Sequence, residues 1–343
     1  MSHPSNRSLV IGDGGWGTAI ALSLHRAGRE VTLWSHDPAY AAEVAAGREN
    51  HKFLPGVPIP PEVRWTADVD EALDGADIYY SVVPTQFLRA TIGRFGGRLA
   101  GMPAVSASKG LELKTLLRPS EILAEAAGAR AGVAVLSGPS HAEETALGLA
   151  TTVVAASTDA ALAERVQEEI SSSALRVYTG GDLVGAELGG ALKNVIAVGA
   201  GVADGLGLGD NAKAALVARG LVEMARFGIH RGARRETFFG LTGAGDLMVT
   251  CYSRHSRNRS LGQRIGAGET LAEVQASTEK VAEGVWTTQA VHQAAAEAGI
   301  EMPITHALHA ILFEGMSCED AVRELMLRPS RPELDPPAAG SAG

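Results

Sequence analysis

Residues 8–24 read Ser8-Leu-Val-Ile-Gly12-Asp-Gly14-Gly15-Trp16-Gly17-Thr-Ala-Ile-Ala-Leu-Ser-Leu24. A short apolar strand precedes glycines at G-x-G-x-x-G spacing, a helical pattern follows, and residues 30–34 supply the next strand. In this context Gly12 permits the tight turn, Gly14 lets the backbone approach a pyrophosphate, and Gly17 lets helix and strand pack closely. The helix N-terminus offers N–H groups to phosphate. The stretch predicts a Rossmann-type dinucleotide site; the alternative is a glycine turn with a structural role only.

The end of the second strand bears on which dinucleotide binds. NAD-specific sites place an Asp or Glu there, where it accepts hydrogen bonds from the adenosine ribose. This chain has Ser35 and His36 at that point, and its first acid, Asp37, comes one or two residues late. An uncharged Ser followed by a His would tolerate a 2′-phosphate, so NADP(H), or both cofactors, is the hypothesis. The alternative is that Asp37 turns back onto the ribose.

Further strands are predicted at 76–84, 104–108, 133–136, 151–155 and 175–178, with a helix over 159–170. This alternation predicts a doubly wound α/β sheet. Lys109 comes directly after one strand, and Ser137-Gly138-Pro139-Ser140-His141-Ala142 follows another. The carboxyl ends of strands are where such sheets bind ligands. Lys109 is therefore a candidate ligand contact, with ordinary loop chemistry as the alternative.

The chain changes character after Gly180-Gly181. Leu188-Gly-Gly-Ala-Leu-Lys193-Asn194-Val-Ile-Ala-Val-Gly-Ala-Gly-Val-Ala203 is a helix of small and apolar residues that should be buried on most sides. Its glycines weaken the helix but permit close approach by another helix or a ligand. A buried Lys193 is costly unless it is paired or neutralised. The pattern indicates a functional site; the alternative is a lysine that reaches the surface beside a tightly packed helix pair.

The rest of the second half is predicted to be helical, over 211–227 and 287–327, and 204–210 is interpreted as a loop because no strand precedes its glycines. Residues 253–259 hold three arginines and several hydrogen-bond donors, which favours a local anion site over a solvated basic turn. The predicted organisation is a Rossmann domain over 1–181, an all-helical substrate-binding domain over 182–330 and a disordered Pro/Gly/Ala-rich tail over 331–343.

Composition narrows the function classes. The 343 residues carry a formal net charge of −9, which argues against general nucleic-acid or anionic-membrane binding. Two cysteines, Cys251 and Cys318, are expected to be reduced thiols in a cytoplasmic protein without a secretory leader.

No run of about 18 apolar residues is present, so no membrane span is expected. Neither HExxH, CxxC, a P-loop nor a Gly-x-Ser-x-Gly elbow occurs. His306 and His309 are interpreted as helix surface, and no metal is predicted.

Taken together, the motifs resemble those of the bacterial NAD(P)-dependent glycerol-3-phosphate dehydrogenases. The resemblance runs from about Leu9 to Leu327 and covers Gly12–Gly17, Ser108–Gly110, Ser137–Pro139, Leu188–Asn194, Gly243–Asp246 and Ser256–Asn258. It implies a Rossmann domain followed by a helical substrate domain. It also implies reversible reduction of dihydroxyacetone phosphate to sn-glycerol 3-phosphate, a precursor for phospholipid synthesis, with NADP(H) or NAD(H) and without a metal.

The resemblance also implies roles for individual residues. Lys193 matches the proton donor and acceptor, and Lys109 matches a contact to both cofactor and substrate. Substrate-binding positions match Gly138, Ser140, Asp246, Ser256, Arg257 and Asn258. Cofactor-binding positions match Gly15, Trp16, His36, Ala142, Arg257, Val281 and Glu283. Many members have Ser where this chain has Gly15, so somewhat weaker cofactor binding is expected.

Two other functions stay open at this point, and so does a homodimeric assembly. A related two-domain dehydrogenase acting on a hydroxy acid would need cations placed for a carboxylate, which the arginines of 253–259 disfavour. A dinucleotide-sensing protein without catalysis would have little use for Lys193, Asp246 and Lys109 together. If the chain is the dehydrogenase, burial and Lys109 should lower the pKa of Lys193, and Asp246 should oppose them.

Overall fold

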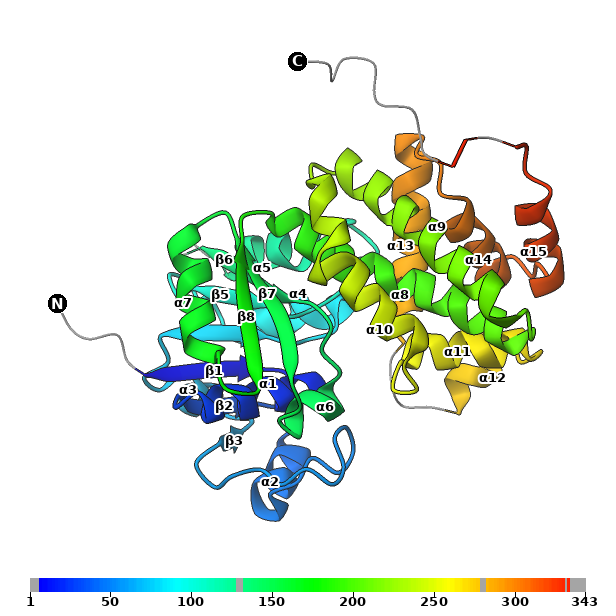
Figure 1. Cartoon of the computed structure of the whole chain (residues 1–343). Helices are drawn as coiled ribbons and strands as arrows, with labels where there is room; N and C mark the ends of the chain where they lie inside the picture. The colour runs from blue at the N-terminus through cyan, green and yellow to red at the C-terminus, as the bar shows by residue number, and fades with distance from the viewer. Residues whose placement is uncertain (1–5, 128–131, 278–281, 331, 334–343) are drawn as a thin grey trace, which may run out of the picture.

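The computed structural model describes residues 6–127, 132–277, 282–330 and 332–333. Its first half alternates strands and helices (Figure 1). The elements are β1 Arg7–Ile11, α1 Gly15–Arg26, β2 Glu30–Trp34, α2 Pro38–Gly47, β3 Arg64–Thr66, α3 Val69–Leu73, β4 Ile78–Ser81, α4 Thr85–Gly93, β5 Ala104–Ser106, α5 Pro119–Ala127, β6 Val133–Ser137, α6 Ala142–Ala146, β7 Thr151–Ser157, α7 Ala160–Ile170 and β8 Leu175–Gly180.

These strands form one sheet in the order β3-β2-β1-β4-β5-β6-β7-β8, which confirms the predicted doubly wound α/β fold. All neighbouring strands are parallel except β6 and β7, which pair antiparallel with Leu136 opposite Ala155. The sequence pattern did not indicate this reversal. It follows from the connection, which contains only the five-residue helix α6, whereas a parallel crossover usually spans a longer helix. The short edge strand β3 was also missed.

The second half is helical and lies to the right of the sheet in Figure 1. Its elements are α8 Leu183–Gly205, α9 Gly209–His230, the 3₁₀ turn η1 Arg235–Phe239, the π-helical turn η2 Leu241–Gly245, α10 Asp246–Tyr252, α11 Arg257–Gly266, α12 Leu271–Ala276, α13 Glu283–Ala298, α14 Pro303–Phe313 and α15 Cys318–Met326. The break predicted at 204–210 is present. The predicted tail lies outside the described residues, apart from 332–333.

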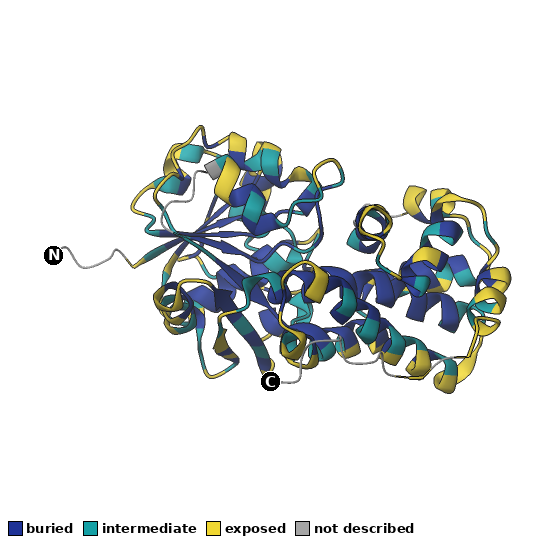
Figure 2. Ribbon diagram, turned by 90° about the horizontal axis from the view of Figure 1, so that it is seen from above, coloured by how far each residue is buried: buried dark blue, intermediate teal, exposed yellow. Residues whose placement is uncertain are grey.

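Helix α8 is the centre of the helical half, and it is buried from Gly185 to Ala203 (Figure 2). Asp182 caps its N-terminus by accepting from the Gly185 N–H at 2.9 Å. Its glycines provide the close approach that was predicted. A Cβ on Gly201 would overlap the Arg259 carbonyl oxygen of α11, and one on Gly262 of α11 would overlap the Val198 carbonyl oxygen of α8. The two helices therefore meet backbone to backbone.

Within the described residues, α8 is also the one helix with the length and composition of a membrane span, at a mean hydropathy of 1.3. It contains no unbroken apolar run of that length, because Glu187, Lys193 and Asn194 interrupt its sequence. In the fold, 94% of its most apolar window is buried inside the protein. Its apolar character is thus accounted for by its place in a protein core.

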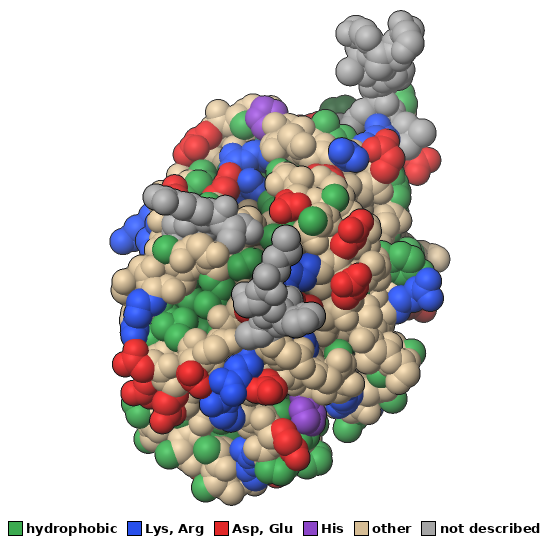
Figure 3. All heavy atoms as spheres, turned by 90° about the vertical axis from the view of Figure 1, so that its left-hand side faces the viewer, with side chains coloured by type: hydrophobic (Ala, Val, Ile, Leu, Met, Phe, Trp, Pro, Cys, Tyr) green, Lys and Arg blue, Asp and Glu red, His purple; other side chains and the backbone are tan. Residues whose placement is uncertain are grey.

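The surface carries mixed charge. On the face of the sheet domain shown in Figure 3, Lys and Arg side chains alternate with Asp and Glu, and no broad field of one sign covers it. This distribution fits the negative overall charge, and it offers no continuous basic track for a nucleic-acid backbone on that face.

Candidate active site

The glycine turn has the geometry that its sequence predicts. Gly12 adopts φ +118°, and a Cβ there would lie 2.8 Å from the Val82 carbonyl oxygen of the loop after β4. A Cβ on Gly17 would overlap the Gly12 carbonyl oxygen, whereas one on Gly14 would meet nothing within 4 Å. Helix α1 has no side-chain N-cap and no acidic residue in its first turn. Its N-terminal N–H groups therefore suit a pyrophosphate.

Gly15 has a steric reason to be glycine in this chain. A Cβ at this position would lie 2.9 Å from the carbonyl oxygen of Phe53, in the loop after α2, and 3.6 Å from the Cβ of Ala142. Trp16 and Ala142 both pack against one buried cluster, which includes Ala19 of α1 and Leu54 of the same loop. Gly15, Trp16 and Ala142, which come from α1 and α6, thus form one wall beside the glycine turn. A serine at position 15 would have to displace the backbone of the 48–59 loop.

Ser35 and Asp37, at the end of β2, already make hydrogen bonds within the protein. The buried Ser35 donates its hydroxyl to Asp13 Oδ2 at 2.5 Å. The Asp37 carboxylate caps α2 by accepting from the N–H groups of Ala39 at 2.9 Å and Tyr40 at 3.2 Å. The helix cap uses Oδ1 of Asp37, and both roles of this residue, helix cap and ribose contact, are compatible with that geometry.

His36 and Arg94 lie at the same place. The His36 side chain is 68% exposed, with its Nδ1 3.8 Å from Asp13 Oδ1. Arg94, directly after α4, donates to the His36 carbonyl oxygen at 3.0 Å, and its guanidinium lies over the Trp34 ring, 4.8 Å from the centroid. Sequence reasoning missed Arg94, because it lies 58 residues from His36.

Two lysines converge on one carboxylate where the two halves meet. Lys193, from the middle of α8, donates to Asp246 Oδ1, and Lys109, from the loop after β5, donates to Asp246 Oδ2 at 2.8 Å. Asp246 is the first residue of α10 and is 1% exposed, and Lys193 is 6% exposed. The lysine of α8 therefore does not reach out to the surface, which was the alternative for it. It is paired inside the protein with Asp246 of the helical half, and the same carboxylate also holds Lys109 from the α/β half.

The arrangement sets the protonation of these groups. Burial lowers the pKa of Lys193 to about 7; the nearby Lys109 acts in the same direction, and Asp246 opposes both. For Lys109, burial is outweighed by the Asp246 carboxylate, so its pKa is raised. Burial would raise the pKa of Asp246, but the two ammonium groups hold it below its ordinary value. The expected direction for Lys193 is confirmed, and the amine can change form near neutral pH.

A second set of polar groups joins α8 to α11 and α13. Asn258 donates to Asn194 Oδ1 at 2.9 Å and accepts from the Gly284 N–H at 2.9 Å. Glu283, at the start of α13, has a pKa raised by burial, while Arg257, Lys109 and Lys193 oppose the rise. Asn258, Glu283 and Arg257 therefore belong to the surroundings of Lys193. Val281, a predicted cofactor contact, lies outside the described residues.

One arginine of the predicted anion site already has a partner in the fold. Arg257, Asn258 and Arg259 lie in the first turn of α11, with the Ser256 hydroxyl accepting from the Arg259 N–H at 3.2 Å. The Nε of Arg259 is engaged, because it donates to Asp204 Oδ2 at 2.6 Å. The sequence count of three arginines did not reveal this partner, 55 residues away. Ser256, Arg257 and the N-terminus of α11 remain for an anion.

The loop after β6 borders the lysines. Gly138 has φ +144°, and a Cβ there would lie 3.0 Å from the Val153 Cα; Ser140 donates to the Gly138 carbonyl oxygen at 2.9 Å. His141 belongs to the same stretch, and the sequence pattern did not predict a role for it. Its Nε2 is buried without a hydrogen-bond partner among the described residues, and burial, followed by Lys193, lowers its pKa. His141 thus lies close enough to Lys193 for the charge of the lysine to lower the pKa of the imidazole, which favours its neutral form.

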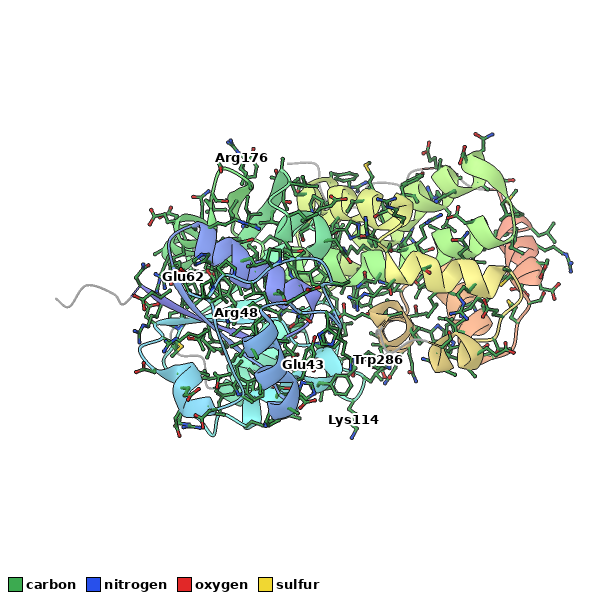
Figure 4. All side chains as sticks on the ribbon, turned by 90° about the horizontal axis from the view of Figure 1, so that it is seen from below. Glu43, Arg48, Glu62, Lys114, Arg176 and Trp286 are labelled. Atoms are coloured by element: carbon green, nitrogen blue, oxygen red, sulfur yellow. The ribbon has the colours of Figure 1, made fainter. Side chains whose placement is uncertain are left out.

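Two contacts hold the halves together around the site. The buried Glu187 of α8 accepts from Arg118 Nη1 at 2.6 Å and from the Ser120 N–H at 2.8 Å, at the start of α5. Trp286 of α13 lies where the two halves meet (Figure 4), and its ring contacts Phe87 of α4 edge-on at 5.8 Å. Both contacts connect a helix of the sheet domain to a helix of the second half.

Comparison with known proteins decides the family. The model of the NAD-dependent glycerol-3-phosphate dehydrogenase N-terminus matches residues 9–163, and that of the C-terminus matches residues 182–323. The chain belongs to this family. A curated relative from Chlorobium limicola, named glycerol-3-phosphate dehydrogenase (NAD(P)+), is 47% identical over 328 residues, which are 95% of this chain and 98% of the relative. One from Exiguobacterium with the same name is 46% identical over 95% of this chain and 96% of its own length.

The family fold agrees with a solved structure. A crystal structure of glycerol-3-phosphate dehydrogenase from Coxiella burnetii matches with a TM-score of 0.91 and 37% identity, over 95% of this chain and all of that one. The family is NAD(P)-dependent and contains the α/β sheet and helical half described above. The resemblance inferred from the motifs is therefore confirmed for family, fold and cofactor class.

Proposed function

We propose that the chain is an oxidoreductase that interconverts dihydroxyacetone phosphate and sn-glycerol 3-phosphate with NAD(P)H. Family membership supports this activity. The observation that carries it is the convergence of Lys193 and Lys109 on the buried Asp246, beside the loops that follow the strands. A paired amine with a pKa of about 7 is suited to give and take a proton at neutral pH.

The bound nicotinamide supplies the hydride. Lys193, as an ammonium, hydrogen-bonds the ketone oxygen and gives it a proton as the alkoxide forms; in the reverse direction its neutral amine accepts the hydroxyl proton. Asp246 orients the amine and limits the fall of its pKa, whereas Lys109 lowers that pKa further. Lys109 also lies where it can contact both cofactor and substrate.

The phosphate of the substrate is held by Arg257, Ser256 and Asn258 at the N-terminus of α11. Main-chain N–H groups and a guanidinium together favour a dianion, and the Arg257 fork fixes its orientation. Gly138, Ser140 and Lys109 hold the rest of the small substrate. Binding energy from the phosphate thereby positions the ketone against Lys193.

For the cofactor, Gly12, Gly14, Gly15, Trp16 and Gly17 receive the pyrophosphate at the α1 N-terminus. Ala142, Arg257, Val281 and Glu283 complete its site. NADPH is the preferred form. The exposed His36 supports this, and so does Arg94, whose guanidinium can pair with a 2′-phosphate as few other groups can.

The cellular role follows from this chemistry. The product supplies glycerol 3-phosphate for phospholipid synthesis, and the chain acts in the cytoplasm. The buried free thiols of Cys251 and Cys318 are compatible with a reducing compartment. The chain divides functionally into a dinucleotide-binding domain over 1–181 and a catalytic helical domain over 182–330.

The activity is tested with dihydroxyacetone phosphate and each reduced nucleotide, followed at the nucleotide absorbance band. Turnover is expected with NADPH, and a Lys193→Ala variant is expected to lose roughly 10²–10⁴-fold in kcat while it still binds nucleotide. Lys114→Ala is the matched control, because this exposed lysine lies far out on the surface (Figure 4). Turnover of a hydroxy acid instead, nucleotide binding without turnover, or a near-normal Lys193→Ala would each contradict the proposal.

A further inference from the structure

A group of imidazoles lies on the α13–α14 hairpin, outside the active site. The His292 ring, on α13, stacks on the His309 ring, on α14, with centroids 3.8 Å apart and planes 12° from parallel. The His306 ring, also on α14, lies 5.2 Å from the His292 ring. His309 Nδ1 is hydrogen-bonded to Glu314 Oε1 at 2.8 Å, directly after α14. Neither the proposed reaction nor the packing of the core uses this group.

The group has the composition of a transition-metal site. His292, His309 and Glu314 each offer one ligand atom, and these three atoms all lie within 4.8 Å of one another. Two ligands of a tetrahedral zinc ion lie about 3.3 Å apart, given Zn–N and Zn–O bonds near 2.0–2.1 Å. The His309 and Glu314 atoms are already closer than that. To bring the ligand atoms together around one ion, the stack has to open by a rotation of the His292 ring, which is half-buried at the helix surface.

The charges also suit a cation. The exposed Glu314 carboxylate supplies one negative charge, and the His292 and His309 imidazoles supply nitrogen donors. Without an ion, His309 Nδ1–H donates to the Glu314 carboxylate, and a bound cation takes the place of this proton. Neutral imidazoles with one carboxylate favour borderline divalent ions such as Zn²⁺ over Mg²⁺ or Ca²⁺.

We propose that His292, His309 and Glu314 form a binding site for one divalent transition-metal ion, with Zn²⁺ as the expected occupant and water in the fourth position. The ion joins α13 to the end of α14 and stabilises the helical half. It takes no part in the hydride transfer, since His292 lies nine residues along α13 from Glu283, which is about 13 Å along the helix axis.

The untagged full chain, stripped of metal with a chelator and dialysed, is titrated with Zn²⁺ by calorimetry and melted with and without Zn²⁺. One ion per chain and a Tm rise of roughly 2 °C or more are expected. Co²⁺ in place of Zn²⁺ should give the intense visible absorption of tetrahedral coordination. His292→Phe and His309→Phe keep an aromatic ring in the stack but remove a ligand, and each should abolish both effects.

His230→Ala is the matched control, because His230 is an exposed histidine at the end of α9 and not a member of this group. It should bind Zn²⁺ like the unaltered chain, and all three variants should keep normal turnover. The proposal is overturned if the unaltered chain shows no saturable Zn²⁺ binding, or if the two Phe variants bind as tightly as the control. Neither result bears on the dehydrogenase activity, which is measured separately.

Discussion

Lys193 is a buried amine held between one carboxylate and a second amine. The cost of burying its charge is the largest influence on its pKa, and it exceeds the stabilisation that Asp246 provides. The result is an amine with a pKa of about 7 next to Lys109, whose pKa is raised by the same carboxylate. Two lysines on one carboxylate thus divide into a permanent cation and a group that can exchange its proton, which is what acid–base catalysis needs.

This division predicts opposite pH dependences for the two reaction directions. Reduction of the ketone needs the Lys193 ammonium, so kcat/KM should be level below about pH 7 and fall roughly tenfold per pH unit above it. Oxidation of the alcohol needs the neutral amine and should rise over the same range. Replacing Lys109 with Met removes a like charge, so both limbs should move to higher pH. Initial rates measured against pH in both directions test this prediction. A kcat/KM for reduction that stays level to about pH 9 would contradict the role of Lys193.

Arg94 is the residue on which cofactor preference is expected to depend. Its guanidinium lies beside the His36 backbone at the end of β2. Arg94→Ala should raise KM for NADPH about tenfold, since a charge-assisted hydrogen bond contributes about 1.5–3 kcal/mol, and should leave KM for NADH nearly unchanged. Arg98→Ala, which removes an exposed arginine paired with Asp70, is the control. An equal change for both nucleotides would show that Arg94 acts through packing instead.

At the scale of elements, the contact between α8 and α11 depends on glycine. Gly201 and Gly205 of α8 face Gly262 and Gly266 of α11, and a Cβ at any of the four would press against the backbone of the other helix. Glycines weaken a helix by about 0.5–1 kcal/mol each relative to alanine. Here they let two helices approach closely enough to hold Lys193 on α8 and Arg257 on α11 within one site.

Gly201→Ala tests this contact. Because the obstacle is the carbonyl oxygen of Arg259 and not a flexible side chain, the free energy of unfolding should fall by about 2–3 kcal/mol, with a Tm fall of roughly 4 °C or more. Gly93→Ala is the control: it lies at the end of α4 with nothing within 4 Å of the added Cβ, so it should be neutral or slightly stabilising. Similar Tm values for the two variants would mean that α8 and α11 adjust without cost.

For the whole molecule, the site exists only where the two halves are held together. Glu187 contributes to this, since its buried carboxylate accepts from Arg118 and Ser120 of the sheet domain. Burial raises its pKa, and Arg118 and Ser120 oppose the rise. A carboxylate buried at such a cost connects the N-terminus of α8, the helix that carries Lys193, to the start of α5.

Removing this connection should destabilise the protein. Glu187→Ala leaves the Ser120 N–H and hydroxyl without their acceptor and takes one partner from Arg118, so a loss of about 3 kcal/mol in the free energy of unfolding is expected. Glu121→Ala removes a more exposed partner of the same arginine and should cost less than about 1 kcal/mol. Thermal unfolding of both variants compares them directly; equal losses would argue against Glu187 as a link between the halves.

The sequence by itself determined what depends on local pattern. The glycine turn with its flanking strand and helix, the alternating strands, the buried glycine-rich helix around Lys193 and the family itself all follow from spacing over a few residues or from motifs in order. These features need no knowledge of which segments lie side by side, because backbone geometry and hydrophobic periodicity decide them. Local pattern singled out Lys193 and made Lys109 a candidate, whereas Asp246 was named only through the resemblance to the family.

Only the tertiary structure decided which candidate residues already have partners within the protein. Asp37 caps α2, Arg259 pairs with Asp204, and Gly15 makes room for the backbone at Phe53. It also brought Arg94 to the end of β2 and His292 against His309. Apart from the Asp37 cap, which is local to residues 37–40, each of these depends on contacts between residues separated along the chain. Periodicity carries no information on such contacts, since they are set by how the packed elements cross.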